Sequence, residues 1–362
     1  MTLPFTTPPE GLCLLRLSAI GDICHMLPIV RTIQHAWPQT RLTWIIGETE
    51  HGLVRSIPGI EFLVLEKASG WRGYAELRRR LRGRRFDALL HMQLSLRASL
   101  ASLCVASPVR LGFDCARARE LQWLVTNHRV AAREREHVQD SFFGFTEALG
   151  IRERVLRWDI PIPDTARAYA ERVIPDGRRT LVISPCSSHP RRNWRAEYYA
   201  QVADYATETL GLHVLLCGGR SAFEREMGAA IEARMRRSCD NLIGKDTLIE
   251  FLATLGRAAA LLTPDSGPAH MATAVGTPVI GLYAATNPAR TGPYLSRQWC
   301  VDRYDAAARA FYRKPAAQLP WTTKIERDGV MDLIAPRDVI EKLDALWADL
   351  SSVGIGARAP GD

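Results

Sequence analysis

The chain has 362 residues, 47% hydrophobic and 24% charged, and its 47 Lys and Arg residues against 39 Asp and Glu residues give a net charge of +8. This length favours two domains, and this composition excludes a disordered, collagen-like or coiled-coil protein. The positive charge favours anionic partners, and phosphorylated substrates, nucleic acid and an anionic membrane surface all fit it.

The cysteines and the N-terminus indicate where the protein works. The eight cysteines form no CxxC pair and no Cys/His ligand spacing, which argues against a zinc site or a disulfide scaffold. Residues 1–10 lack the basic start and apolar core of a secretion signal, and no window approaches eighteen uninterrupted apolar residues. We therefore expect a cytoplasmic protein that is neither secreted nor membrane-spanning.

The first part of the chain alternates short apolar runs with longer amphipathic stretches, which predicts a parallel sheet covered by helices. Strands are expected at 12–17, 42–46, 62–65, 88–91 and 109–112, and helices at 23–36, 74–81 and 96–105. A polar passage with prolines, 158–164, then interrupts the pattern. We place the domain boundary there, so that the first domain spans residues 1–165.

The alternation restarts near residue 180. Strands are expected at 180–184, 213–217, 259–263 and 278–283, and helices at 196–210, 222–236, 248–255 and 268–274. This second domain spans 166–335, and the segment 336–362 adds a helix at 338–350 and a loose tail. The predicted fold class is α/β, with two similar sheets in one chain.

The loop after the first predicted strand holds the first candidate site. Ligands of open α/β sheets bind where strands end and helices begin. Gly21 lets the backbone approach a substrate closely, and the carboxylate of Asp22 is placed to take a proton. Capping of the following helix by Asp22 is the alternative. The loop has no GxGxxG, which counts against a nicotinamide or flavin enzyme.

A tight turn in the second domain leads from a strand into a helix of small residues. Helix N-termini attract anions, so Asp265, Ser266 and Gly267 are expected to form a diphosphate-binding turn, with His270 adding a hydrogen bond. Capping by Asp265 or Ser266 is the alternative.

Two further loops carry weaker signals. Ser187 and Ser188 follow the strand at 180–184, and two arginines, the second of them Arg192, come shortly after. Hydroxyl and guanidinium groups suit phosphate oxygens, although a solvated basic loop is an equal alternative. Gly219 ends the next strand, and Glu224, or its neighbour Glu226, is placed to reach a sugar or ribose hydroxyl.

The stretch 71–85 contains seven arginines in fifteen residues. Such a run is usually a solvated helix face. The functional alternative is contact with anionic lipid head groups. Nucleic acid is disfavoured because no interleaving of aromatic and basic residues accompanies the run.

Together these motifs resemble glycosyltransferase family nine, the lipopolysaccharide heptosyltransferases. The resemblance spans residues 11–345 and rests on 15–22 with His25 and Pro28, 192–194, 265–270 and 286–293, supported by 110–113 and 137–140. It implies a GT-B fold, in which two Rossmann-like domains face each other across a cleft. The first domain would bind the acceptor and the second the nucleotide sugar, and the C-terminal helix would pack back toward the first domain.

The resemblance further implies transfer of heptose from ADP-heptose to the inner core of lipopolysaccharide, with inversion and without a cofactor or metal ion. Asp22 would be the general base, and Ser18, Gly21 and His25 would lie on the acceptor side. Arg192, where the family commonly has lysine, would neutralise the leaving diphosphate.

The donor side would comprise Ser187, Ser188, Gly219, Glu224, Asp265, Ser266, Gly267 and His270. The enzyme is expected to be cytoplasmic, peripheral on the inner face of the inner membrane, and without nucleic-acid partners. Two alternatives stay open. One is another GT-B activity, such as a different nucleotide-sugar transferase or an epimerase, and the other is a noncatalytic member that binds nucleotide or saccharide.

Overall fold

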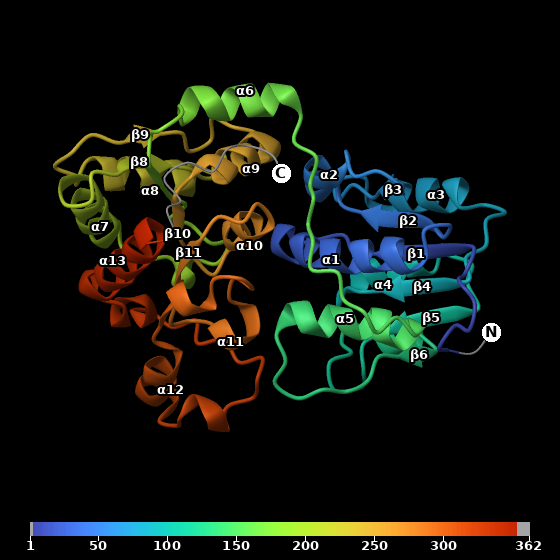
Figure 1. Cartoon of the computed structure of the whole chain (residues 1–362). Helices are drawn as coiled ribbons and strands as arrows, with labels where there is room; N and C mark the ends of the chain where they lie inside the picture. The colour runs from blue at the N-terminus through green and yellow to red at the C-terminus, as the bar shows by residue number, and fades with distance from the viewer. Residues whose placement is uncertain (1–2, 353–362) are drawn as a thin grey trace. The chain divides into compact units, whose positions relative to one another are not determined.

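The computed structural model describes residues 3–352, coloured along the chain in Figure 1. The chain forms two compact units, Met1–Pro161 and Ile162–Asp362. This division lies close to the boundary expected at residue 165. Among the described residues, no helix has the length and apolar character needed to cross a bilayer.

The first unit contains a six-stranded parallel sheet in the order β3-β2-β1-β4-β5-β6. Its strands are β1 (Gly11–Leu15), β2 (Arg41–Ile46), β3 (Ile60–Val64), β4 (Ala88–His91), β5 (Val109–Gly112) and β6 (His128–Arg129). The central strand β1 pairs with both neighbours, so that Leu12 lies beside Leu42 of β2 and Ala88 of β4. All residues of β1 are buried, because helices cover both faces of such a sheet.

The helices of the first unit are α1 (Ile20–Ala36), α2 (Glu48–Val54), α3 (Gly70–Arg80), α4 (Leu96–Ser102), the short 3₁₀ helix η1 (Gln122–Leu124) and α5 (Val138–Leu149). Leu77 of α3 and Ala98 and Ala101 of α4 pack with β1 and β4 in one hydrophobic core. Helix α1 packs against α5. Right-handed crossovers place α1 and α3 on opposite faces, because the chain leaves β1 and β3 in opposite directions along the sheet.

The second unit repeats this topology. Its strands are β7 (Thr180–Ile183), β8 (His213–Leu216), β9 (Asp240–Asn241), β10 (Ala260–Pro264), β11 (Val279–Tyr283) and β12 (Val301–Asp302). They form a parallel sheet in the order β12-β11-β10-β7-β8-β9. Counted from the first strand of each unit, both sheets have the Rossmann order 3-2-1-4-5-6.

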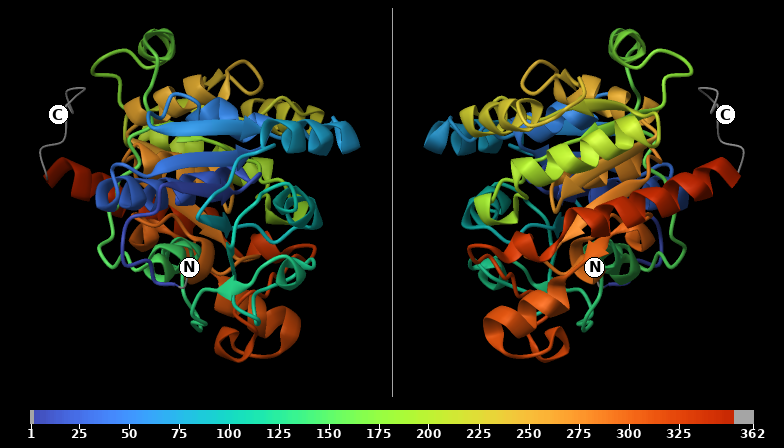
Figure 2. Two further views of the ribbon diagram at one scale, coloured as in Figure 1. Left: turned by 90° about the vertical axis from the view of Figure 1, so that its right-hand side faces the viewer. Right: turned by 90° about the vertical axis from the view of Figure 1, so that its left-hand side faces the viewer.

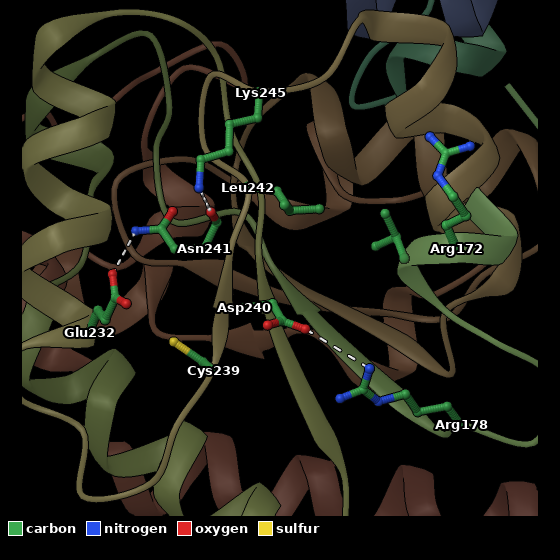
Figure 3. A pocket seen from close by; sticks show the side chains of 9 residues that line it. Arg172, Arg178, Glu232, Cys239, Asp240, Asn241, Leu242 and Lys245 are labelled. Atoms are coloured by element: carbon green, nitrogen blue, oxygen red, sulfur yellow. Dashed lines mark hydrogen bonds and ion pairs between the residues drawn. The ribbon is translucent and has the colours of Figure 1, made fainter. Parts of the chain in front are cut away.

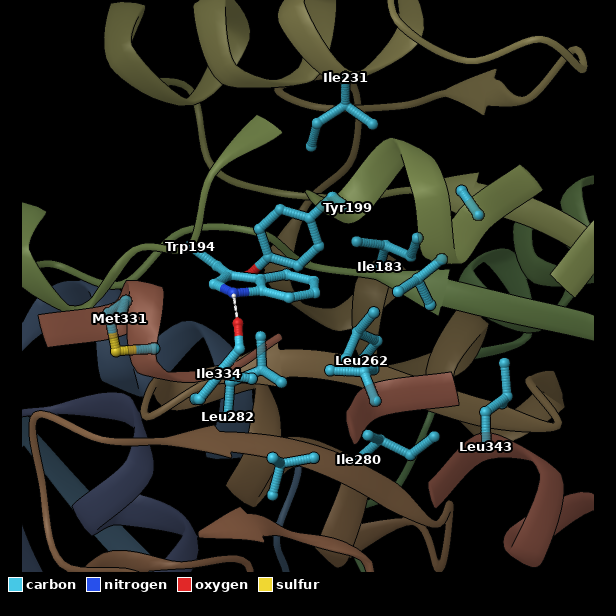
Figure 4. Close-up of a cluster of buried hydrophobic side chains, with 14 of the residues drawn as sticks. Ile183, Trp194, Tyr199, Ile231, Leu262, Ile280, Leu282, Met331, Ile334 and Leu343 are labelled. Carbon is cyan, nitrogen blue, oxygen red and sulfur yellow. Dashed lines mark hydrogen bonds between the residues drawn. The ribbon is translucent and has the colours of Figure 1, made fainter. Parts of the chain in front are cut away.

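The α-helices of the second unit are α6 (Asp164–Val173), α7 (Ala196–Glu208), α8 (Ala222–Glu232), α9 (Leu248–Arg257), α10 (Gly267–Ala274), α11 (Pro288–Thr291), α12 (Tyr304–Tyr312) and α13 (Pro336–Ser352). Short 3₁₀ helices are η2 (Pro190–Arg192), η3 (Arg297–Trp299), η4 (Ala316–Gln318) and η5 (Val330–Leu333). The core contains Trp194 stacked edge-on against Tyr199, with Leu262 of β10 nearby (Figure 4). The Trp194 indole donates a hydrogen bond to the Ile334 carbonyl at 3.0 Å, so its one polar atom is satisfied inside the core.

The C-terminal helix α13 lies beside α7 (Figure 2, right). Its apolar face, with Val339, Leu343 and Leu346, is buried in the core of the second unit. The predicted contact of this helix with the first domain stays a prediction. The tail predicted beyond residue 352 lies outside the described residues.

Candidate functional site

Most of the predicted site residues lie in loops that follow the strands at the switch point of each sheet. In each unit the chain leaves two adjacent central strands in opposite directions, between β1 and β4 and between β7 and β10. Ligands of open α/β sheets bind outside the carboxyl ends of the strands at such a point. Asp22 follows β1, Ser187 follows β7 and Asp265 follows β10 directly.

Asp22 is the third residue of α1 and is paired with the guanidinium of Arg16. Its side chain is 30% exposed, so the carboxylate is accessible while one oxygen is held. The same oxygen lies 3.5 Å from the backbone N–H of Ala19, which is a weak version of the capping alternative. Arg16 and the Ala19 N–H both contact this oxygen and so fix the direction of the side chain. The role of Asp22 as a general base stays a prediction.

Gln93, which was not predicted as a site residue, fixes the loop that leads to Asp22. Its side-chain oxygen accepts a hydrogen bond from the Leu17 N–H at 2.6 Å, and its amide donates to the Ser18 hydroxyl at 3.1 Å. Gln93 follows β4, the other strand at this switch point. The rule that selected Asp22 could have found it, because both strands end at the same place.

His25 is buried in α1, 4% exposed. One ring nitrogen lies 3.0 Å from the side-chain oxygen of Gln139, whose amide donates to the His25 carbonyl at 3.0 Å. The ring also packs edge-on against His137. These contacts join α1 to α5. The Gly21 backbone is likewise buried in the first turn of α1, and the acceptor-side role of both residues is untested.

In the second unit, side-chain hydrogen bonds join the loops that follow β7 and β10. The Ser187 hydroxyl donates to the Asp265 carbonyl at 2.9 Å, and the Thr263 hydroxyl donates to the Ser184 carbonyl at 2.8 Å. The Ser187 N–H donates to the side chain of Asn193 at 2.6 Å. The two loops therefore form one structure at the switch point, with Ser188 exposed beside it.

Arg192 lies between two carboxylates. Its Nη1 is 3.3 Å from Asp265, and its Nε and Nη2 lie 2.9 and 2.7 Å from one oxygen of Glu326. The Arg192 side chain is only 14% exposed. Three of the five N–H groups of an arginine are used in this way, which leaves one on each Nη for a ligand.

Glu326 was not predicted, because it lies more than a hundred residues from Arg192 in a loop without a motif. Burial alone would raise the pKa of its carboxyl group. The hydrogen bond from Arg192 and the charges of Arg192 and His189 outweigh this effect, so the pKa is lowered below its ordinary value. Glu326 is therefore ionised at neutral pH.

The Arg192 loop is held along the whole segment 326–334. Arg191 pairs with Asp328 at 2.8 Å, Arg195 pairs with Asp332, and Trp194 donates to Ile334. The side chains alternate between exposed ion pairs and buried contacts. Arg191 and Arg195 are half exposed, so the alternative of a solvated basic loop stays open for them, whereas the Arg192 side chain is mostly buried.

The turn before α10 shows how the expected anion site is built. Ser266 is the N-cap residue, but its hydroxyl lies 2.8 Å from the Thr263 hydroxyl and makes no cap hydrogen bond. The Asp265 carboxylate faces Arg192 instead. The capping alternative is thus not what these two side chains do. Gly267 begins the helix and His270 is buried within it, 8% exposed.

Glu224 contacts the backbone of its own loop. It forms a capping box with Ser221 at the start of α8, and its carboxylate accepts a hydrogen bond from the Gly219 N–H at 2.8 Å. A Cβ at Gly219 would lie 2.7 Å from this carboxylate, so glycine permits the contact. A contact of Glu224 with a sugar hydroxyl stays a prediction.

A pocket of about 440 Å³ lies elsewhere on the second unit, beside β9 (Figure 3). It is lined by Arg172, Val173, Arg178, Glu232, Cys239, Asp240, Asn241, Leu242 and Lys245, and none of these is a predicted site residue. Within residues 3–352, no group of three or more His, Cys, Asp or Glu side chains is placed to hold a metal ion. The expected absence of a metal cofactor is not tested by this observation.

Comparison with known proteins gives consistent matches. The model of glycosyltransferase family 9 (heptosyltransferase) matches residues 74–319. The lipopolysaccharide core heptosyltransferase OpsX of Haemophilus influenzae is 40% identical over 342 residues, which cover 94% of this chain and 98% of that protein.

Two solved structures have the same fold. A family 9 glycosyl transferase from Veillonella parvula superposes with a TM-score of 0.78 at 22% identity, covering 94% of this chain and 98% of that one. ADP-heptose LPS heptosyltransferase II of E. coli superposes with a TM-score of 0.72 at 20% identity, covering 94% and 99%. The predicted α/β fold with two Rossmann-like units of the GT-B class is confirmed.

Proposed function

The chain belongs to glycosyltransferase family 9, the heptosyltransferases, and on this premise we propose that it transfers heptose from ADP-heptose to the inner core of lipopolysaccharide with inversion at the anomeric carbon. The similarity to the Haemophilus influenzae core heptosyltransferase over almost the full length of both chains supports this substrate pair.

The proposal rests on the position of Arg192, which is ion-paired with Asp265 and Glu326 at the switch point of the second unit. Its two remaining N–H groups suit the oxygens of a diphosphate. When the bond from the anomeric carbon to ADP breaks, negative charge grows on the leaving diphosphate. A guanidinium that is already fixed stabilises that charge without reorganisation, aided by the Ser187 loop and the N-terminus of α10.

Asp22 is the proposed general base. The acceptor hydroxyl oxygen attacks the anomeric carbon on the side opposite the departing ADP, and its proton passes to the Asp22 carboxylate. Attack from the opposite side inverts the configuration at that carbon. Ser18, Gly21 and His25 are proposed to border the acceptor, since the Asp22 loop and the start of α1 contain them.

We also propose that the enzyme works in the cytoplasm at the inner face of the inner membrane. Arg79 pairs with Glu76, and Arg84 pairs with Glu61, so these two arginines of the basic run are engaged locally. The other five, Arg72, Arg78, Arg80, Arg82 and Arg85, are exposed. Each basic residue near an anionic surface contributes about 1 kcal/mol to association. Vesicle cosedimentation that is unchanged after neutralising these five would contradict the proposed role of the run.

The deciding experiment is mass spectrometry of the products from ADP-heptose and a panel of truncated core acceptors. We expect one heptose to be added to a core acceptor. If ADP-heptose is neither bound nor consumed while a uridine sugar is, the alternative of another GT-B activity replaces the proposal. Binding of ADP-heptose without turnover on any acceptor would favour the noncatalytic alternative.

A further inference from the structure

Three large apolar side chains are exposed within four consecutive residues of the first unit. Leu121 is 48%, Trp123 53% and Leu124 59% exposed. They belong to η1 and the residue before it, in the loop between β5 and β6, two strands labelled in Figure 1. We call the segment Leu121–Leu124 the wedge. Single exposed leucines are common in soluble proteins, but a contiguous exposed apolar group marks an interaction site.

Gln122, the one buried residue of the wedge, fixes the wedge to the rest of the first unit. Gln122 is fully buried, its amide nitrogen donates to the His91 carbonyl at 2.8 Å, and its oxygen accepts from the Phe113 N–H at 3.0 Å. The Ser99 hydroxyl donates to the Glu120 carbonyl at 2.9 Å. These hydrogen bonds fix the backbone of the wedge, and the fixed backbone keeps the three apolar side chains exposed to water.

The backbone is strained where the wedge begins. Glu120 and Leu121 have φ angles of 52° and 61°, in the left-handed region that disfavours side chains with a Cβ. Such a conformation persists only where surrounding contacts impose it. The strain and the Gln122 anchor together keep Leu121 and Trp123 directed outward.

The anchor also connects the wedge to the acceptor-side loop. The Gln122 amide lies 3.3 Å from the carbonyl of Gln93, whose side chain holds Leu17 and Ser18 in the loop that leads to Asp22. A surface that binds the wedge is thereby held at a fixed place relative to this loop.

The charges around the wedge select the partner. Arg119 and Arg129 precede and follow it, and both are exposed, as is the carboxylate beside the wedge, Glu120, so that the two arginines leave a net positive charge. Leucine and tryptophan enter the boundary between lipid head groups and acyl chains, and arginine beside them contacts lipid phosphate. We propose that the wedge inserts into an anionic lipid bilayer and thereby presents the Asp22 loop to an acceptor anchored in that bilayer. The presentation of an acceptor to the Asp22 loop rests on the proposed function. Insertion of the wedge into a bilayer does not, and it can be measured by itself.

Insertion is measured by quenching of tryptophan fluorescence with brominated lipids, in vesicles of phosphatidylethanolamine and phosphatidylglycerol. We expect quenching of the wild-type protein, and loss of most of it in Trp123→Phe, because phenylalanine retains insertion but removes the reporter. Trp71→Phe measures separately the quenching that comes from contact of the basic run, because Trp71 is the single tryptophan of that run and is 76% exposed. Equal quenching of wild type and Trp123→Phe overturns the proposal.

Affinity is measured by cosedimentation with the same vesicles. Leu124→Ser is expected to bind about tenfold more weakly, the effect of withdrawing most of one leucine side chain from an apolar phase. Leu156→Ser is the matched control, because Leu156 is 47% exposed in the same unit but outside the wedge. Equal losses in the two variants, or equal binding to phosphatidylcholine vesicles, overturn the proposal.

Activity separates the wedge from the acceptor site itself. Leu124→Ser should lose about tenfold in transfer to a vesicle-embedded acceptor, in line with its weaker binding, and keep wild-type transfer to a deacylated, soluble one. A loss on the soluble acceptor would mean that the wedge contacts the saccharide, and overturns the inference. If the wild type transfers heptose to neither acceptor, the proposed function fails, while the quenching and sedimentation results still decide the membrane contact.

Discussion

At the scale of single residues, the two proposed catalytic side chains are held in different ways. Asp22 has one ion-pair partner and a partly exposed carboxylate. Arg192 has two acidic partners and little exposure. A base must meet and release a proton, whereas a charge-stabilising group must stay in place, and the two environments fit these tasks.

Replacing Asp22 by asparagine tests the base. Asparagine keeps the shape of the side chain but cannot take a proton, so we expect turnover to fall about 10²- to 10⁴-fold. ADP affinity, measured by calorimetry, should stay unchanged because the proposed donor residues lie in the other unit. Asp87→Asn is the control, because Asp87 accepts a hydrogen bond from the Gly11 N–H at the opposite end of β1. Wild-type turnover in Asp22→Asn would remove Asp22 from the mechanism.

Glu326→Gln tests whether Glu326 positions Arg192. Glutamine lacks the charge that aligns the Nε edge of the guanidinium, so we expect turnover to fall about tenfold with little change in thermal stability. Asp328→Asn is the control, because it removes only the ion pair with the exposed Arg191. It should change the rate less than twofold.

The same substitution in an Arg192→Lys background gives a second readout. Lysine has no Nε edge, so Glu326→Gln should cost less there than in the wild type. Rate losses that simply multiply would show that Glu326 acts independently of Arg192.

The sequence pointed to the part of the candidate site that follows strands. Asp22, Ser187 and Asp265 could be selected because parallel strands deliver their following loops to one edge of the sheet. Gln93 satisfies the same rule but was not selected. Glu326 could not be found in this way, because it comes from a loop far along the chain and only the folded second unit places it beside Arg192.

At the scale of elements, the apolar face of α13 completes the core of the second unit. Leu343 is 1% exposed and packs with the sheet and α7. Leu343→Ala should therefore lower the free energy of unfolding by about 2–5 kcal/mol in urea denaturation. Glu341→Ala, on the exposed side of the same helix, should change it by less than about 0.5 kcal/mol. Equal effects would contradict the buried packing of α13.

All the strands and helices predicted from periodicity are present, with shifted ends. Helix α8, predicted to reach residue 236, ends at Glu232, and α4, predicted to reach 105, ends at Ser102. The strands β6, β9 and β12 were not predicted, because two residues are too few to show an alternation. Helices α2, α5, α11 and α12 were not predicted either, although α5 has twelve residues.

At the scale of the whole molecule, the proposed chemistry uses fixed side chains of the protein in place of a metal ion. We expect transfer in excess EDTA to proceed within about twofold of the rate with Mg²⁺, because Arg192 and the α10 N-terminus supply the stabilisation of the diphosphate. Initial rates after removal of divalent ions measure this. Loss of activity that Mg²⁺ restores would contradict the metal-independent mechanism.

Because the chain has two units with the same strand order, a loss of activity in a substituted variant has to be interpreted for the unit that carries the substitution. Each sheet is sandwiched by its own helices and has its own hydrophobic contacts, so each unit is expected to melt as a separate cooperative block. A single melting temperature then does not describe the chain. A substitution can abolish transfer by unfolding one block while the other keeps its native spectrum, so loss of activity must be compared with the stability of the block that carries the substitution.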